Sequence, residues 1–188
     1  TEAGPNGIAF ADIDVDGKPD LIIANTLSNT ISVYRNISTS GSISAGSFSA
    51  RIDFATGAFP QGVAIGDIDG DGKPDLAVTN FNSNSVSVFR NTSTSGSIST
   101  GSFALKVDLA TGSHPENVAI GDLDGDGRPD LAVTNNGDDL VSIFRNTGTA
   151  GSITTGSFAA RIDLPTGPGS GPWGIVIGDV DGDDKPDL

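Results

Sequence analysis

The 188-residue sequence contains no cysteine and no methionine, and it has only one histidine and one tryptophan. Because cysteine is absent, disulfides and thiolate metal sites are excluded, and one histidine is too few for a typical zinc centre. Basic residues are scarce as well: 10 Lys and Arg stand against 24 Asp and Glu, and the formal net charge is −14. Nucleic-acid binders carry basic patches, and an anionic membrane surface would repel this chain. We therefore expect no nucleic acid among the partners and no insertion into a membrane.

Long apolar runs and helical periodicity are also missing. No apolar stretch reaches the length of a membrane span, and no secretory signal peptide is visible. The chain has instead 26 glycines and many Ser, Thr and Asn residues, a mixture typical of short strands joined by turns. No nucleophile, base and orienting residue recur together, so we expect that the protein is not an enzyme.

The most prominent pattern is a short acidic motif that occurs four times. It begins at Asp12, Asp67, Asp122 and Asp179, so the spacings are 55, 55 and 57 residues. A fixed period of this size predicts a repeat architecture. We treat residues 1–188 as a single repeat module and expect it to be part of a longer chain or an assembly. It consists of three full repeats of about 55 residues and the start of a fourth, at about 1–55, 56–110, 111–167 and 168–188.

Each repeat contains four candidate strands, which in the second repeat lie at 63–66, 76–79, 86–90 and 103–109. Apolar and polar residues alternate, most clearly in SVSVF at 85–89, as they do in half-buried strands. Four short antiparallel strands per unit are typical of a β-propeller blade. A solenoid is the alternative geometry, although solenoid repeats built from strands are usually shorter. We therefore predict an all-β fold with propeller-type blades of four antiparallel strands.

The acidic motif, DIDGDGKPDL at 67–76, has carboxylates at its positions 1, 3, 5 and 9 and a glycine at position 6. Two carboxylates ~4 Å apart repel each other by roughly 4 kcal/mol at an effective dielectric constant of about 20, so four of them together need a cation. Ca²⁺ takes about six to eight oxygen ligands from carboxylates and carbonyls, whereas Mg²⁺ prefers strict octahedra with several waters. A polar Asp-Gly turn would explain one copy of the motif, but four copies at one phase favour a metal site.

We predict about one Ca²⁺ per acidic loop, up to four, which would take the formal charge from −14 to −6. The fourth loop has Asp184 at position 6 where the others have glycine, and we expect it to bind more weakly. The predicted ligands are the carboxylates at positions 1, 3, 5 and 9 and the backbone carbonyl at position 7. They are Asp12, Asp14, Asp16, Lys18 and Asp20; Asp67, Asp69, Asp71, Lys73 and Asp75; Asp122, Asp124, Asp126, Arg128 and Asp130; and Asp179, Asp181, Asp183, Lys185 and Asp187.

The segment GDIDGDGKPDLAVTN (66–80), followed by SVSVFRN (85–91), resembles the FG-GAP/VCBS repeat family. The sequence is similar to the repeats in the propeller head of integrin α subunits and in many bacterial secreted proteins, and the resemblance covers essentially the whole chain. It implies a Ca²⁺-loaded β-propeller whose metal loop connects the first two strands of each blade. VTN at 78–80 replaces the GAP element, as in the bacterial type. No ligand-binding residue of integrins has a counterpart here.

We therefore expect a secreted or cell-surface, calcium-stabilised repeat module for adhesion or for binding a protein or carbohydrate ligand. Two alternatives remain open. The chain could be a structural subunit of a self-assembling surface filament or layer, or the non-catalytic propeller part of a larger secreted hydrolase.

Further residues stand out against the repeat pattern. His114 is expected in a surface loop. Trp173 is expected to pack at a blade edge, and the alternative is that it stacks on a sugar or on a partner. Asn36 and Asn91 begin N-glycosylation sequons. Aromatic residues that recur at one phase are expected in the core between repeats: Tyr34, Phe89 and Phe144, and Phe48, Phe103 and Phe158.

Overall fold

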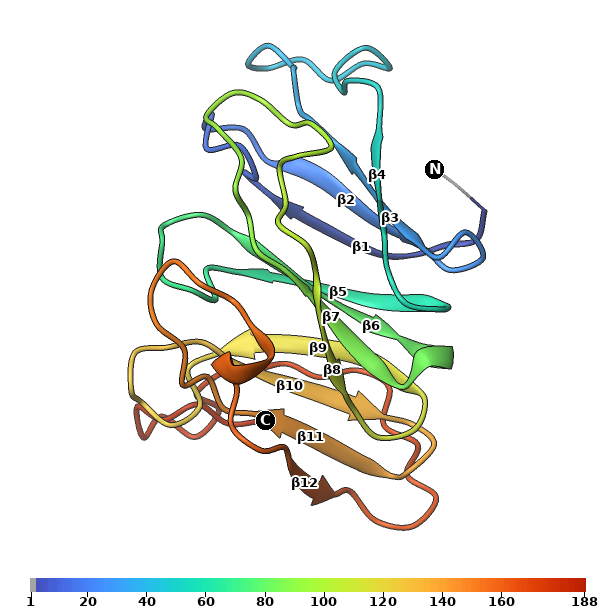
Figure 1. Ribbon diagram of the computed structural model, residues 1–188, viewed down its shortest axis with the longest axis vertical. Helices are drawn as coiled ribbons and strands as arrows, with labels where there is room; N and C mark the ends of the chain where they lie inside the picture. Colours follow the sequence, from blue (N-terminus) through green and yellow to red (C-terminus); the bar gives the residue numbers. More distant parts are fainter. Residues whose placement is uncertain (1–2) are drawn as a thin grey trace.

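The computed structural model describes residues 3–188 and contains three antiparallel sheets of four strands, one sheet for each full repeat (Figure 1). Within each sheet the strands are neighbours in chain order. Helix is limited to two short 3-10 turns, η1 (Phe81–Ser83) and η2 (Thr155–Ser157). The predicted all-β fold with blades of four antiparallel strands is confirmed. The strands are β1 (Pro5–Ala11), β2 (Asp20–Asn25), β3 (Thr30–Tyr34) and β4 (Ile52–Ala55); β5 (Pro60–Gly66), β6 (Asp75–Asn80), β7 (Ser85–Phe89) and β8 (Val107–Ala110); and β9 (Pro115–Gly121), β10 (Asp130–Asn135), β11 (Leu140–Phe144) and β12 (Ile162–Pro165).

The first strands of the three repeats lie side by side, β1 against β5 and β5 against β9 (Figure 1). Glycine makes this close approach possible, because a Cβ atom on Gly7 would collide with the backbone carbonyl of Gln61. At the equivalent position of the second repeat, a Cβ atom on Gly62 would lie 2.8 Å from the carbonyl oxygen of Glu116. In a propeller, the first strand of each blade lies beside the first strand of the next blade, and the three sheets are arranged in this way.

The core consists of two apolar layers, each filled from two neighbouring repeats. The layer between the first and second repeats includes Ile22, Val33 and Leu76, and the layer between the second and third includes Val88 and Leu131. Strand β6 contributes to both layers, because side chains alternate between the two faces of a sheet, and all six of its residues are buried. The aromatic residues of the second and third repeats occupy these layers as predicted: Phe89 and Phe103 in the first, and Phe144 and Phe158 in the second.

In the second repeat, the boundaries of β6 and β7 lie within one residue of the predicted ones, whereas β5 and β8 differ more. Strand β5 begins at Pro60 rather than Val63, with a register shift between these residues in its pairing with β6. Strand β8 is shorter than predicted, because Phe103 forms only an isolated bridge with Asn91 before the chain reaches the sheet. Between residues 166 and 188 the structure contains one isolated bridge and no strand.

The two ends of the strands form different surfaces. The acidic loops lie on the edge at the left of Figure 1, which we call the loop end. The β2–β3, β6–β7 and β10–β11 hairpins and the connections between repeats lie on the opposite edge, which we call the hairpin end. Among the described residues, no helix has the length and apolar character needed to cross a membrane.

Candidate metal centres

Each acidic loop of a full repeat connects the first two strands of its sheet, at residues 12–19, 67–74 and 122–129. All four motifs bring three carboxylates together, with one oxygen of each within 4.8 Å of the others. Two oxygens bound to one Ca²⁺ at about 2.3–2.6 Å can be at most about 5 Å apart, so this spacing fits a single ion. The clusters are Asp12, Asp14 and Asp20; Asp67, Asp69 and Asp71; Asp122, Asp124 and Asp130; and Asp179, Asp181 and Asp187.

The second carboxylate of the first loop, Asp14, is completely buried. Its Oδ2 atom pairs with Nε of Arg35, whereas its Oδ1 atom has no hydrogen-bond partner. Among residues 3–188, this is the only buried carboxylate oxygen without a partner. A buried charge without a partner is costly, and a cation bound beside Oδ1 would supply one. The all-oxygen donor set fits a hard cation such as Ca²⁺.

The first carboxylate of each motif folds its loop. Asp12 accepts hydrogen bonds from the N–H groups of Asp16 (2.9 Å) and Gly17 (2.7 Å), and the first Asp of the other three motifs does the same. The turn needs a left-handed residue at position 6, where Gly17 has a φ of 87°. Asp184 adopts the same region with a φ of 62°, so the fourth loop keeps its turn despite the substitution.

The last carboxylate of the motif ties the loop to the sheet. Asp75 accepts hydrogen bonds from the N–H group of Ile68 within the loop (2.9 Å) and from that of Asn91, just beyond the end of β7 (2.7 Å). Burial raises the pKa of Asp75 to about 7, although the hydrogen bond from Asn91 lowers it. Burial also raises the pKa of Asp20 to about 6, and the charge of Asp14 adds to this effect. Burial therefore disfavours the ionised form of these two carboxylates more than their hydrogen bonds favour it.

The remaining predicted ligands are placed differently. The carboxylate at position 5 lies outside the cluster in three loops and meets a basic side chain; Asp16, for example, accepts a hydrogen bond from Nη2 of Arg35 at 2.6 Å. In the second loop Asp71 belongs to the cluster and Asp75 does not. The ligand role of the backbone carbonyls at position 7, beginning with Lys18, stays a prediction.

Basic side chains compensate only part of the charge of each loop. In the first loop, four carboxylates are accompanied by Lys18 within the motif and by Arg35 at the end of β3. Arg90 and Arg145 take the place of Arg35 in the next two repeats, where they pair with the acidic loop of their own sheet. The formal charge of each of these sites is −2, which one divalent cation would neutralise.

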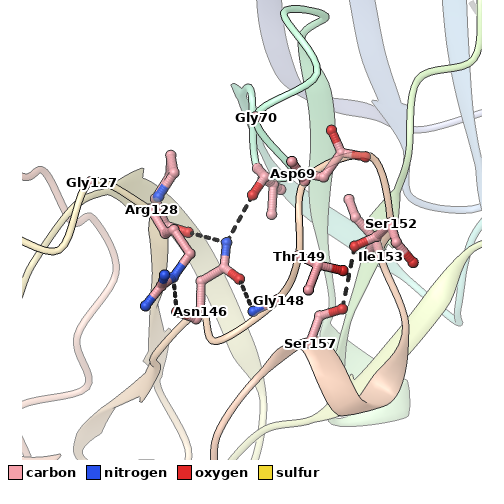
Figure 2. A pocket seen from close by; sticks show the side chains of 13 residues that line it. Asp69, Gly70, Gly127, Arg128, Asn146, Gly148, Thr149, Ser152, Ile153 and Ser157 are labelled. Carbon is pink, nitrogen blue, oxygen red and sulfur yellow. Dashed lines mark hydrogen bonds between the residues drawn. The ribbon is translucent and has the colours of Figure 1, made fainter.

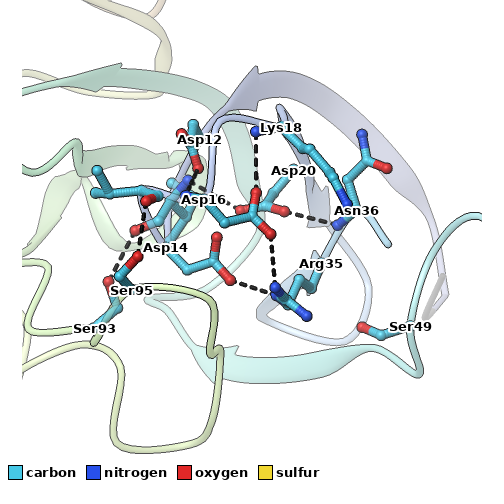
Figure 3. A network of polar contacts seen from close by, with 12 residues as sticks. Asp12, Asp14, Asp16, Lys18, Asp20, Arg35, Asn36, Ser49, Ser93 and Ser95 are labelled. Carbon is cyan, nitrogen blue, oxygen red and sulfur yellow. Dashed lines mark hydrogen bonds and ion pairs between the residues drawn. The ribbon is translucent and has the colours of Figure 1, made fainter. Parts of the chain in front are cut away.

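Each of the first two acidic loops is fastened to the following repeat by contacts that we call the inter-repeat clamp. In Figure 3 the connection between β7 and β8 lies against the first loop. Ser93 Oγ donates to the carbonyl of Ile13 and Ser95 Oγ to that of Val15, both at 2.9 Å. Asn91 Nδ2 also donates to Ile13, at 2.8 Å. The clamp fixes the backbone that carries Asp14.

The second clamp has fewer side chains than the first. Asn146 Nδ2 donates to the carbonyl of Ile68 in the second repeat (2.8 Å) and to that of Pro129 in its own repeat (3.0 Å). Figure 2 shows Asn146 with the dashed lines of its hydrogen bonds. Gly148 and Ala150 replace the two serines of the first clamp, so no side-chain hydroxyl reaches the second loop from these positions. A cavity of about 260 Å³ lies beside them.

The sequon at Asn91 is not an accessible glycosylation site in the folded chain, because Asn91 is completely buried in the clamp. Sequence reasoning missed this role. The signal that could have shown it is recurrence: Asn146 stands at the same phase and makes the same contacts although no sequon follows it.

Comparison with known proteins agrees with this geometry. The family model described as FG-GAP-like repeat matches the chain three times, over residues 12–78, 67–133 and 122–188. Each match begins at the first carboxylate of an acidic loop, and the first two end within the second strand of the following repeat. No curated protein matches the chain. Because the three matches together span residues 12–188, the chain belongs to the FG-GAP-like repeat family.

Proposed function

We propose that this protein is an extracellular repeat module, secreted or at the cell surface, that uses calcium to hold its fold and acts in adhesion or ligand binding rather than catalysis. The observation that carries the proposal is the buried Asp14, whose Oδ1 atom lies unpaired in a cluster of three carboxylates. A cluster of three carboxylates recurs in the acidic loop of every repeat, always with the carboxylates at positions 1 and 3 of the motif. Repetition at a single structural position favours a stabilising ion over a single reaction centre.

The metal assignment follows from the donor set and the charge. Each cluster offers carboxylate oxygens alone, which favours calcium over zinc. The acidic loops of the three full repeats each have a formal charge of −2, so each needs two positive charges for neutrality. When bound, the ion supplies charge compensation, and the chain's own residues do the rest: Asp12 folds the loop, Asp20 anchors it to the sheet, and Asn91 fixes it to the next repeat.

The test is calorimetric titration of calcium into protein freed of metal, followed by thermal melts with and without a chelator. We expect up to four ions per chain and a marked fall in melting temperature on chelation. Asp14→Asn should remove one site from the stoichiometry, whereas Asp138→Asn, at an exposed residue of the hairpin end, should remove none. An unchanged melt with chelator would overturn the calcium assignment.

A second candidate function, head-to-tail assembly into a filament or layer, is favoured by apolar side chains on the two outer faces of the stack. Ile8 and Phe10 on β1 are 58% and 60% exposed, and Val176 and Val180 in the fourth repeat are 77% and 83% exposed. Within the stack, the equivalent first strands pack against each other. Light scattering at several protein and calcium concentrations separates this candidate from a monomeric binding module, and Phe10→Ser should abolish any assembly.

A further inference from the structure

The repeats differ from one another mainly at the hairpin end. The acidic motifs are nearly identical from repeat to repeat, whereas three positions of the hairpin end change character completely. The only histidine and the only tryptophan of the chain occupy two of these positions. The three sets of equivalent residues are Gly4, Phe59, His114 and Gly171; Asn6, Gln61, Glu116 and Trp173; and Thr26, Phe81 and Asn136.

Three of these variable residues form a continuous row of rings. The rings of Phe81 and His114 are stacked, with centroids 4.4 Å apart and an interplanar angle of 17°. Phe59 extends the row on the other side of Phe81, with a centroid distance of 5.8 Å. His114 is exposed and both Phe rings are partly exposed, so the row belongs to the surface rather than to either apolar layer of the core.

The backbone under this row is strained. Phe59 and His114 have φ values of 61° and 54°, in the left-handed region, where the equivalent positions carry Gly4 and Gly171. A bulky residue there costs roughly 1–2 kcal/mol relative to the right-handed region, and such outliers cluster at functional sites. The position is also held firmly, because Asn84 Oδ1 accepts a hydrogen bond from the N–H group of His114 at 2.9 Å.

A polar pocket of about 140 Å³ is lined by Gln61 and Glu116, two residues beyond Phe59 and His114 in the chain, and by Trp173, whose side chain is 69% exposed. The expected packing of this tryptophan at a blade edge is therefore not what the structure has. Thr134 Oγ1 fixes its backbone carbonyl at 3.1 Å. The amides of Asn6 and Gln61 hydrogen-bond to each other inside the pocket, and Glu116 completes its polar wall. Phe59 and Gln61 thus carry a ring and a neutral amide within two residues of each other at the hairpin end.

The charges of this surface select against anions. Its ionisable groups include the carboxylates of Glu116 and Asp138, and the only base among its rings and pocket residues is His114. Amide groups offer both donors and acceptors, as hydroxyl-rich molecules require, and the negative face of an aromatic ring attracts polarised C–H groups. We propose that the hairpin end binds a neutral carbohydrate, with Phe81, His114 and Trp173 stacking on sugar rings and Asn6 and Gln61 bonding to hydroxyls. This inference rests on the proposed binding function and names its ligand class.

The experiment uses calcium-loaded protein and a panel of neutral oligosaccharides from glucan, mannan, galactan and chitin, with an oligolysine peptide as the cationic competitor. Because Trp173 is the only tryptophan, its fluorescence reports directly on the pocket. We expect saturable binding of one oligosaccharide class, and a loss of at least about tenfold in affinity for Trp173→Ala and Phe81→Ala, measured by calorimetry. Leu105→Ala, at a side chain that is 97% exposed outside this surface, is the matched control and should bind as the parent does.

Three results would overturn the inference: no oligosaccharide binds, binding is unchanged in both variants, or the oligolysine peptide binds this surface instead. Phe81 is partly buried, so its replacement can also destabilise the fold; the Phe81→Ala result therefore counts only if the variant melts at the same temperature as the parent. Trp173 is exposed, so Trp173→Ala needs no such condition. Calcium binding is measured on the same samples. A protein that binds calcium but no sugar contradicts only this inference, whereas loss of calcium binding contradicts the proposed function itself.

Discussion

At the residue scale, the acidic loops contain carboxylates that are buried in the fold even without a bound cation to neutralise their charge. Asp75 and Asp130 are essentially inaccessible to solvent, and burial raises the pKa of both. The carboxylates at positions 1 and 3 gather in every loop, whereas the third member of the cluster is position 9 in three loops and position 5 in the second, a choice that the motif did not predict. It could not predict how deeply each carboxylate would be buried, since that depends on the repeat packed against the loop.

The raised pKa of Asp75 predicts a pH dependence. In the metal-free fold its pKa is about 7, against an ordinary value of 3.8. The folded chain therefore keeps a proton that the unfolded chain has lost, and the metal-free fold loses stability as pH rises from about 4 to about 7. A calcium ion in the same loop favours the ionised form of Asp75 through its charge, so the difference in melting temperature between calcium-loaded and metal-free protein should increase from pH 5 to pH 8. Thermal melts in matched buffers check this, and a constant difference would contradict it.

Val15 provides a second residue-scale prediction. It occupies position 4 of the first loop with a φ of 53°, where Gly70, Gly125 and Gly182 stand in the other loops. A β-branched residue in the left-handed region is strained, and Val15→Gly should stabilise the protein by about 1 kcal/mol even after the greater entropy loss of glycine. Urea unfolding of the calcium-loaded protein measures the change. Val176→Gly, at an exposed valine without positive φ, should give no such gain.

At the scale of elements, the period and the alternation of apolar residues were sufficient to predict four strands per repeat and their order. They did not predict that β8 would begin only at Val107. Residues 103–106 precede the strand and lie outside the sheet, because the chain reaches them from the clamp. The recurrence of Asn91 and Asn146 at one phase could have indicated a structural role, but it could not identify the partner, since Asn91 reaches a carbonyl 78 residues away in another repeat. No local pattern encodes such a contact.

The clamp leads to a prediction about Asn146, which is 3% exposed. Asn146→Ala would leave the carbonyls of Ile68 and Pro129 without this donor, and should lower the free energy of unfolding by roughly 2 kcal/mol or more. Denaturant unfolding measures the loss. Asn82→Ala removes an amide from an exposed position in η1 and should cost less than about 0.5 kcal/mol. Equal losses in the two variants would mean that the clamp contributes nothing specific.

At the scale of the whole molecule, the net charge of −14 should make the metal-free protein sensitive to salt. Repulsion among carboxylates destabilises the compact state and is screened within about 10 Å at 0.1 M salt. Raising sodium chloride from about 0.02 to 0.5 M should therefore increase the melting temperature of the metal-free protein more than that of the calcium-loaded one. Sodium sulfate at equal ionic strength serves as a check on ion-specific effects. Identical salt responses would show that the loops do not dominate the electrostatics.

The clamp also has a mechanical consequence. Because the first two acidic loops are each held by the repeat that follows, a repeat pulled away from the stack must first release the loop behind it. Tension along the stack would therefore break hydrogen bonds to the metal loops before it opens a sheet. The first clamp has two serine hydroxyls that the second lacks, so the second should yield first. The number of bound ions and the make-up of each clamp would together set the order in which the repeats separate.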